Sequence, residues 1–287
     1  MKIAILGTGH MGRAIGSRLL DKGHAVTVWN RTPGRAFELE RRGATAALSA
    51  QEAASSADVV MTLLTADEAV KSVILEGGVL SALRPGAVLV DMSTVSPGTS
   101  RELGRATPAK RFVDAPILGG PEATQNGKAK LLLAGEKDVV ESLNWLWGDI
   151  AAEYYYCGPN GNATTLKLLS NLMLVGGTVL LAEAIATAQR NGIDNATLLS
   201  VFKQSPAIAP GVQVRFDDVL AGDHDGWWTI RLAQKDMGLA LALARSQGLA
   251  LPAAETSLQA LDAAEQAGLG DKDLGSVIEP IRSRSNG

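Results

Sequence analysis

The sequence predicts an α/β domain built on a doubly wound parallel sheet, followed by a long helix and an all-α domain. Three observations support this fold class. The first 135 residues alternate short runs rich in Val, Ile and Leu with helical patterns, as parallel strands covered on both faces do. From about residue 161 onward the patterns are helical only. The length of 287 residues suits two domains.

The strands and helices of the first part follow one another in order. We expect strands at residues 2–6, 25–29, 58–64, 87–92, 111–115 and 130–134. Between the early strands, helices are expected at 11–22, ending at Gly23, and at 33–42, ending at Gly43. Thr32 is a candidate N-cap of the second helix, with Pro33 as its first residue.

The second part opens with one long helical pattern. Residues 162–191 contain no proline and are apolar nearly all round, so we expect this helix to be buried on most sides. We place the domain boundary after residue 160: the first domain is 1–160 and the second is 161–287, with 161–191 joining them. Further helices are expected at 196–204, 213–220, 230–247, 252–267 and 274–284.

Composition excludes several classes of protein. Hydrophobic residues at 46% and charged residues at 20% exclude disorder as the main state. The single cysteine, Cys157, excludes an internal disulfide framework and a Cys-rich metal site. A net charge of -3 without a basic segment gives no support for nucleic acid binding.

No signal peptide is visible, and we judge the most apolar stretch, residues 166–181, too short and too polar to span a bilayer. We therefore expect no membrane partner and a cytoplasmic protein, or one in an organelle matrix if a targeting segment has been removed.

A glycine-rich motif directly follows the first expected strand and opens the first expected helix. It consists of Gly7, Gly9 and Gly12, with His10 and Met11 between the last two glycines. In this context, the glycines permit a tight turn, close approach of a pyrophosphate and close helix–strand packing. The motif predicts a dinucleotide-binding Rossmann domain; the alternative is a turn with chance glycines.

The end of the second strand indicates which dinucleotide is bound. NAD-binding domains usually carry an acid there, whereas this chain has Asn30, Arg31 and Thr32. Asn30 and Thr32 can hydrogen-bond a 2′-phosphate and Arg31 can offer its guanidinium, so we predict NADP(H) as the cofactor. The alternative is that Arg31 points to solvent.

Two further loops follow the third and fourth strands. Leu64 and Thr65 end the third strand, and Thr94 follows the fourth. Ligands of open α/β sheets lie beyond the carboxyl ends of the strands, so we expect these residues to contact the cofactor.

Lys167 and Asn171 lie four residues apart on the long helix, and hence on one face of it. A lysine in an otherwise apolar pattern is a candidate proton donor, because desolvation lowers the pKa of an ammonium group. A snorkelling or salt-bridged lysine is the alternative from this pair alone.

With these residues in place, the whole chain resembles the β-hydroxyacid dehydrogenase family, which includes 3-hydroxyisobutyrate dehydrogenase and glyoxylate/succinic semialdehyde reductases. The resemblance implies a Rossmann domain, an interdomain helix and a helical domain of the 6-phosphogluconate dehydrogenase type. Four blocks carry it: 7–12 with 30–32; Asp-Ala-Pro-Ile-Leu-Gly-Gly at 114–120; Gly-Pro-Asn-Gly at 158–161 leading to Lys167 and Asn171; and Lys235-Asp236.

The resemblance also implies roles for single residues. Lys167 matches the catalytic lysine, a general acid that protonates the carbonyl oxygen, and Asn171 matches the residue that positions the lysine and substrate. Thr94 and Lys235 match cofactor contacts on the nicotinamide side, and Asp236 matches a residue that orients this region. The implied active site lies in the cleft between the two domains.

The predicted substrate site departs from the family pattern at one position. Gly119 and Gly120 match part of the loop that binds the substrate carboxylate, but Leu118 stands where the family usually has Ser. The substrate carboxylate is then held by backbone and Lys235, lies further away, or is absent. Trp228 is a candidate substrate contact.

An acidic cluster, Asp223, His224 and Asp225, precedes Trp228. We interpret it as a solvated loop and predict no metal site.

The sequence therefore favours an NADP(H)-dependent oxidoreductase that interconverts a small β-hydroxy acid and its semialdehyde or keto acid. An imine reductase and a non-catalytic NADP-binding module are the alternatives. Because one small helical domain cannot easily cover a helix that is apolar all round, and because the family forms such assemblies, we expect a homodimer or homotetramer.

Overall fold

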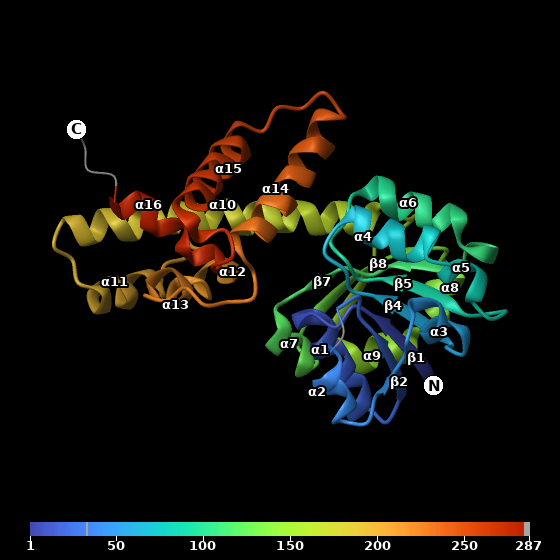
Figure 1. Cartoon of the computed structure of the whole chain (residues 1–287). Coiled ribbons are helices and arrows are strands. Elements are labelled where there is room, and N and C mark those ends of the chain that lie inside the picture. Colours follow the sequence, from blue (N-terminus) through green and yellow to red (C-terminus); the bar gives the residue numbers. More distant parts are fainter. Residues whose placement is uncertain (33, 284–287) are drawn as a thin grey trace. The chain divides into compact units, whose positions relative to one another are not determined.

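A computed structural model describes residues 1–32 and 34–283. The chain divides into two compact units, Met1–Lys167 and Leu168–Gly287. This division falls inside one continuous helix, α10 (Asn162–Arg190). The first unit is an α/β domain of Rossmann type and the second is helical, which confirms the predicted fold class (Figure 1).

The first unit is built on one sheet with the strand order β3-β2-β1-β4-β5-β6-β8-β7, and β9 pairs with β8. β1 to β6 run parallel, β8 is antiparallel to β6 and β7, and β9 is parallel to β8. The strands are β1 (Lys2–Leu6), β2 (Ala25–Trp29), β3 (Thr45–Ala46), β4 (Val59–Thr62), β5 (Val88–Asp91), β6 (Phe112–Asp114), β7 (Ile117–Leu118), β8 (Lys130–Gly135) and β9 (Glu153–Tyr156). All six expected strands are present.

Side chains of the central strands alternate between two apolar cores, one on each face of the sheet. In β1, Ile3 and Ile5 enter one core and Ala4 and Leu6 the other. Burial on both faces explains why these strands are continuous apolar runs in the sequence. The helices of this unit are α1 (His10–Asp21), α2 (Phe37–Glu40), α3 (Ala50–Ser55), α4 (Asp67–Lys71), α5 (Val79–Ala82), α6 (Pro97–Ala106), α7 (Pro121–Gln125), α8 (Lys137–Ser142) and α9 (Asn144–Ile150).

Helix α2 differs from the prediction. It begins at Phe37 and ends at Glu40, with Ala36 as its N-cap, so the expected range 33–42 and the expected N-cap Thr32 are wrong. Gly34 has a φ of 81°, a left-handed conformation that a helix cannot contain. Pro33, the predicted first residue, lies outside the described part of the chain.

The second unit is helical around one apolar core. In its described residues, the β pairing is limited to an isolated bridge between Thr229 and Asp273. Of the segment expected at 213–220, residue 213 ends one helix and residues 216–220 form a second one, and residue 284 of the last expected helix is outside the described residues. The helices after α10 are α11 (Asn195–Phe202), α12 (Pro210–Gln213), α13 (Phe216–Leu220), α14 (Ile230–Arg245), α15 (Pro252–Ala264) and α16 (Ile278–Ser283).

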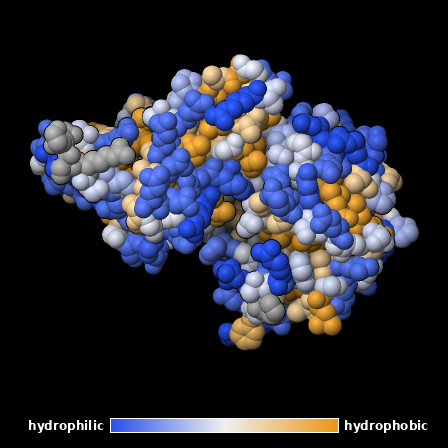
Figure 2. Space-filling model, turned by 45° about the horizontal axis from the view of Figure 1, so that its top comes forward, coloured by the Kyte–Doolittle hydropathy of each residue, from blue (hydrophilic) through white to orange (hydrophobic). Residues whose placement is uncertain are grey.

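Helix α10 has a buried side and an exposed apolar side. Val179 and Ile185 lie in the core of the helical unit, whereas Met173 is 72% exposed and Leu180 is 66% exposed. The expectation that α10 is buried on most sides is therefore wrong, because one copy of the chain leaves an apolar side of this helix exposed. On the face of the molecule shown in Figure 2, hydrophobic patches are interspersed with hydrophilic residues.

By length and composition alone, α10 could cross a membrane, contrary to the expectation from residues 166–181. Core helices of soluble proteins pass the same test of length and composition, and the buried side of α10 is part of the apolar core of the helical unit.

Candidate functional site

Glycines shape the turn between β1 and α1. Gly7 has a φ of 107°, and a Cβ there would lie 2.3 Å from the carbonyl oxygen of Leu63. A Cβ on Gly12 would lie 1.9 Å from the carbonyl oxygen of Gly7. A side chain at either position would collide with backbone, so the turn and the close helix–strand packing both require glycine.

Gly9, the N-cap of α1, has the opposite surroundings. Apart from the glycine itself and its chain neighbours, no residue has an atom within 4 Å of the position that its Cβ would take, and Gly9 supplies no side-chain hydrogen bond to cap the helix. The helix therefore begins, at His10 and Met11, with backbone N–H groups that no N-cap side chain covers. Such an end attracts anions. The loop thus fits the pyrophosphate of a dinucleotide: it has open space at Gly9 and N–H donors beside it.

Asn30 connects this glycine loop to the loop after β2. Its Oδ1 accepts a hydrogen bond from Thr8 N at 3.1 Å, and its Nδ2 donates to the carbonyl oxygen of Thr32 at 3.1 Å. Both ends of the amide are engaged within the protein, so Asn30 holds the two loops together. The side chains of Arg31 and Thr32 are exposed beside it, at the position predicted to meet a 2′-phosphate.

Ser93 connects the two other predicted cofactor loops. Its Oγ accepts a hydrogen bond from Leu64 N at 2.9 Å, which ties the loop after β4 to the loop after β5. Of the predicted contacts, Thr65 is exposed and Thr94 is partly buried next to Ser93. These residues lie at the carboxyl ends of neighbouring parallel strands, where ligands of this fold bind.

Asp91, at the end of β5, anchors Ser93 in turn. It is 1% exposed, and its Oδ1 accepts hydrogen bonds from Ser93 N at 3.0 Å and Thr62 Oγ1 at 2.6 Å. Burial raises the pKa of Asp91 to about 6, although the hydrogen bonds from Ser93 and Thr62 lower it. Ser93 belongs to the loop predicted to contact the cofactor, whereas Asp91 was not predicted, although an acid that ends an apolar strand was a usable signal.

The predicted substrate loop offers backbone and an apolar side chain. Leu118 is partly buried and packs against a small apolar cluster that includes Ala163 of α10. Gly119 is exposed with a φ of 140°, a conformation that an L side chain rarely adopts. The loop therefore presents its main chain at Gly119 and Gly120.

Helix α10 carries Lys167, partly buried, and Asn171, 5% exposed, one turn apart. In the helical unit, Asn171 Nδ2 donates to Asp236 Oδ2 at 2.7 Å, and Lys235 Nζ lies 2.9 Å from Asp236 Oδ1. Asp236 is 4% exposed on α14. This buried carboxylate thus brings together two predicted site residues, Asn171 and Lys235, that are 64 positions apart in the sequence.

Trp228, a predicted substrate contact, lies in the apolar core of the helical unit. It is 6% exposed in the core of the helical unit and stacks on Trp227, with ring centroids 6.1 Å apart. Its burial assigns it to the core packing of the unit.

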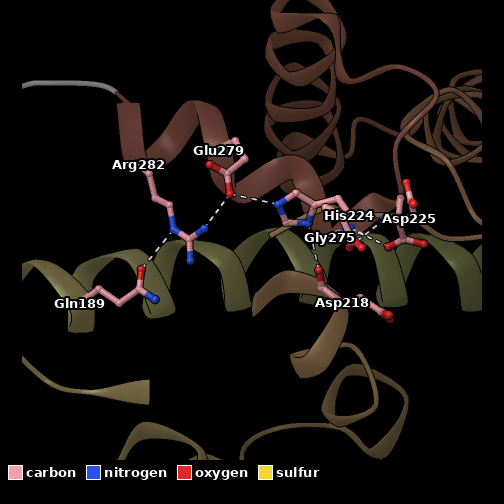
Figure 3. A network of polar contacts seen from close by, with 9 residues as sticks. Gln189, Asp218, His224, Asp225, Gly275, Glu279 and Arg282 are labelled. Atoms are coloured by element: carbon pink, nitrogen blue, oxygen red, sulfur yellow. Dashed lines mark hydrogen bonds and ion pairs between the residues drawn. The ribbon is translucent and has the colours of Figure 1, made fainter. Parts of the chain in front are cut away.

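His224 of the acidic cluster belongs to a polar network (Figure 3). It is 3% exposed; its Nδ1 lies 3.1 Å from the carbonyl oxygen of Asp218 and its Nε2 lies 3.0 Å from Glu279 Oε1. Asp225 instead pairs with Lys272 at 2.7 Å on the surface. In the described part of the chain, no group of three or more His, Cys, Asp or Glu side chains could hold a metal ion.

Two family models match nearly the whole chain. The NAD binding domain of 6-phosphogluconate dehydrogenase matches residues 2–158, and the NAD-binding domain of NADP-dependent 3-hydroxyisobutyrate dehydrogenase matches residues 161–281. Together they cover both the unit with the glycine loop and the unit with Asn171 and Asp236.

Individual proteins are also similar to this chain over nearly its whole length. Glyoxylate/succinic semialdehyde reductase 1 of Arabidopsis thaliana is 30% identical over 98% of this chain and 99% of its own. The cytokine-like nuclear factor N-PAC of Xenopus tropicalis is 31% identical over 96% of this chain and 52% of its own. The solved structure of Psf3 with NADP+ and 2-OPP has a TM-score of 0.90 and 25% identity, covering 97% of this chain and 99% of that chain. From the glycine loop, the helix with Lys167 and Asn171, and these matches, the chain belongs to the β-hydroxyacid dehydrogenase family of NAD(P)-dependent oxidoreductases.

Proposed function

We propose that the protein is an NADP(H)-dependent oxidoreductase that interconverts a small β-hydroxy acid and its semialdehyde or keto acid, with Lys167 as the general acid and base. The observation that carries the proposal is the arrangement on α10. Lys167 lies one turn before Asn171, and the amide of Asn171 is fixed by the buried carboxylate of Asp236. A fixed amide beside an ammonium group is suited to orient a carbonyl oxygen for protonation.

The chemistry divides between cofactor and protein. A bound nicotinamide supplies or accepts the hydride. In reduction, the Lys167 ammonium stabilises the negative charge that develops on the carbonyl oxygen and then donates its proton to that oxygen. In oxidation, the neutral Lys167 amine accepts the hydroxyl proton. Asn171 can hold the same oxygen through its amide, while Lys235 lies on the other side of Asp236.

The preference for NADP(H) rests on the loop after β2. Arg31 and Thr32 are exposed at the strand end, where an acid would repel a 2′-phosphate. A charge-assisted hydrogen bond from Arg31 contributes about 1.5–3 kcal/mol, or roughly tenfold to a hundredfold in preference. The family model for an NADP-dependent enzyme and the NADP+ complex of Psf3 support this choice.

The preference is tested by measuring kcat/KM with NADPH and NADH. Arg31→Glu should lower the NADPH/NADH ratio by about tenfold to a hundredfold or more. Arg105→Glu, on the exposed side of α6, is the matched control and should leave the ratio unchanged. An unchanged ratio in Arg31→Glu would refute the assignment.

The proposed substrate is a small molecule with one anionic group. Gly119 and Gly120 offer backbone N–H groups, and Lys235 offers an ammonium group, but Leu118 contributes no hydroxyl. The apolar Leu118 also keeps imine reduction as a second candidate. Oxidation of NADPH with glyoxylate, succinic semialdehyde, methylmalonate semialdehyde and a cyclic imine separates the two activities.

The role of the lysine is tested by Lys167→Ala. This variant should lose carbonyl turnover by at least about a hundredfold while it binds NADPH nearly as tightly as the wild type. Lys137→Ala is the control, because that side chain is 70% exposed on α8. Turnover retained in Lys167→Ala would exclude the mechanism. Tight NADPH binding without turnover of any compound in the panel would instead favour a non-catalytic NADP-binding module.

Self-association is part of the proposal. Met173, Leu180 and Val214 expose 72%, 66% and 73% of their surface in the helical unit, and a second copy would cover apolar side chains of this kind. We expect a homodimer or homotetramer by light scattering; a monomer at micromolar concentration contradicts this. We also propose a cytoplasmic location without nucleic acid or membrane partners, which cell fractionation would test.

A further inference from the structure

Helix α10 begins without a side-chain cap from its own sequence. The residue before it, Gly161, has a φ of 94°, and a Cβ there would lie 2.8 Å from Arg101 Nη1 and 3.1 Å from the carbonyl oxygen of Pro97. The left-handed φ and the nearby carbonyl oxygen of Pro97 disfavour a side chain at this position. Asn162 N donates locally to the carbonyl oxygen of Pro159 at 3.2 Å, but the other N–H groups at the start of the helix need an acceptor from elsewhere in the fold.

Asp114, at the end of β6, supplies that acceptor. Its Oδ2 accepts hydrogen bonds from Gly161 N at 3.2 Å and from Thr164 N at 3.4 Å, and Thr164 Oγ1 lies 3.5 Å away. Its Oδ1 accepts from Asn160 Nδ2 at 2.9 Å. The partners Asn160 Nδ2, Gly161 N and Thr164 N can only donate, so the site requires an acceptor at both oxygens.

The Asp114 carboxylate is buried and depends on its hydrogen bonds for stabilisation. It is fully buried, and burial raises the pKa of Asp114, although hydrogen bonds from Asn160, Gly161 and Thr164 lower it. A buried carboxylate is costly unless it is well hydrogen-bonded. The positive end of the α10 dipole adds to its stabilisation as an anion.

We propose that Asp114 is a positioning residue for Lys167, an inference that rests on the proposed function. Lys167 lies five residues into α10, or about 7.5 Å along the helix axis from its first residue. Asp114 also opens the segment that leads to Gly119 and Gly120. One carboxylate thus sets the start of the lysine helix against the start of the predicted substrate loop, all within the first unit.

Asp114→Asn tests this role with the smallest change of shape. Whichever way the new amide turns, its NH2 group faces a donor, either Asn160 Nδ2 or the N–H groups of Gly161 and Thr164. The first turn of α10 then shifts, and a shift of about 1 Å at a catalytic group can cost about a hundredfold in rate. We expect kcat per bound NADPH to fall about tenfold to a hundredfold, with the NADPH dissociation constant within about threefold of the wild-type value.

The primary deuterium isotope effect on kcat, measured with NADPH deuterated at the transferred position, should rise because the chemical step becomes slower. Asp58→Asn is the matched control: this carboxylate of the same unit also accepts from a backbone donor, Lys2 N at 2.9 Å, but lies at the amino end of β4. It should change neither kcat nor the isotope effect. If Asp114→Asn does not fold, Thr164→Val removes only the hydroxyl and should lower kcat about twofold to fivefold with the same change of isotope effect.

Unchanged kcat per bound NADPH in these variants would overturn the inference. So would a parallel loss of kcat and NADPH affinity with an unchanged isotope effect, because that is the result of a purely structural defect. Lys167→Ala, measured in the same assays, distinguishes a failure of the proposed function from a failure of the positioning role of Asp114. If it retains turnover, the proposed function fails; if it is inactive while Asp114→Asn is fully active, only the positioning role of Asp114 fails.

Discussion

The buried carboxylate of Asp91 predicts how the stability of the protein depends on pH. Its folded-state pKa of about 6 lies above the ordinary value of 3.8 because burial disfavours the charged form. A group with a raised folded-state pKa contributes stability that is present below pH 3.8 and lost as the pH rises to about 6. The difference of about 2.2 pH units corresponds to about 3 kcal/mol.

Asp91→Asn removes this titration without changing the shape of the side chain. The Asn Oδ1 can accept from Ser93 N and Thr62 Oγ1 as before, and its NH2 takes the place of Oδ2, which has no hydrogen-bond partner. The free energy of unfolding of the variant relative to the wild type should therefore increase by about 2.4 kcal/mol between pH 4 and pH 7, because part of the titration lies below pH 4, and should change little above pH 7.

Urea unfolding followed by circular dichroism, at half-unit steps from pH 4 to pH 8, measures this difference. A difference that does not change with pH, or that falls as the pH rises, would refute the reasoning.

Two further predictions concern the glycine loop and a buried ion pair. Gly12→Ala should lower the midpoint of thermal unfolding, because its Cβ would lie 1.9 Å from a backbone oxygen. Gly9→Ala should unfold at the wild-type temperature but bind NADPH more weakly, because its Cβ would meet only a bound pyrophosphate. Equal midpoints for the two variants would contradict this. Arg215→Met should destabilise the helical unit by about 3–5 kcal/mol, because it leaves Asp273 buried without its cation. Arg231→Met, at a 55% exposed ion pair, should cost less than about 1 kcal/mol in the same unfolding experiment.

Much of the fold could be predicted because its physical causes are local. Strands buried on both faces are apolar runs, and all six were found within a few residues of their ends. The missed strands lack that signal: β3 and β7 have two residues each, and β9 reads Glu-Tyr-Tyr-Tyr and is exposed throughout. The start of α2 was wrong because the left-handed Gly34 interrupts a pattern that otherwise resembles a helix.

The candidate site was predictable where the backbone demands a residue type and not where contacts connect distant segments. The glycine loop follows from steric rules that apply to single positions. By contrast, the hydrogen bonds of Asp114 reach residues 46–50 positions away, and Asp236 meets Asn171 across 65 positions. The place of Trp228 in the core likewise follows from packing that the sequence does not encode locally.

The bridge made by Asn30 has a consequence for attempts to exchange the cofactor. An acid at this position is the obvious substitution toward NAD, since such an acid would bind the ribose hydroxyls. The Asn30 side chain, however, both accepts from the glycine loop and donates to the loop that bears Arg31. Asp could accept but not donate, so the exchange would loosen the loop while changing its charge. Redesign is better directed at Arg31 and Thr32, with Asn30 kept as scaffold.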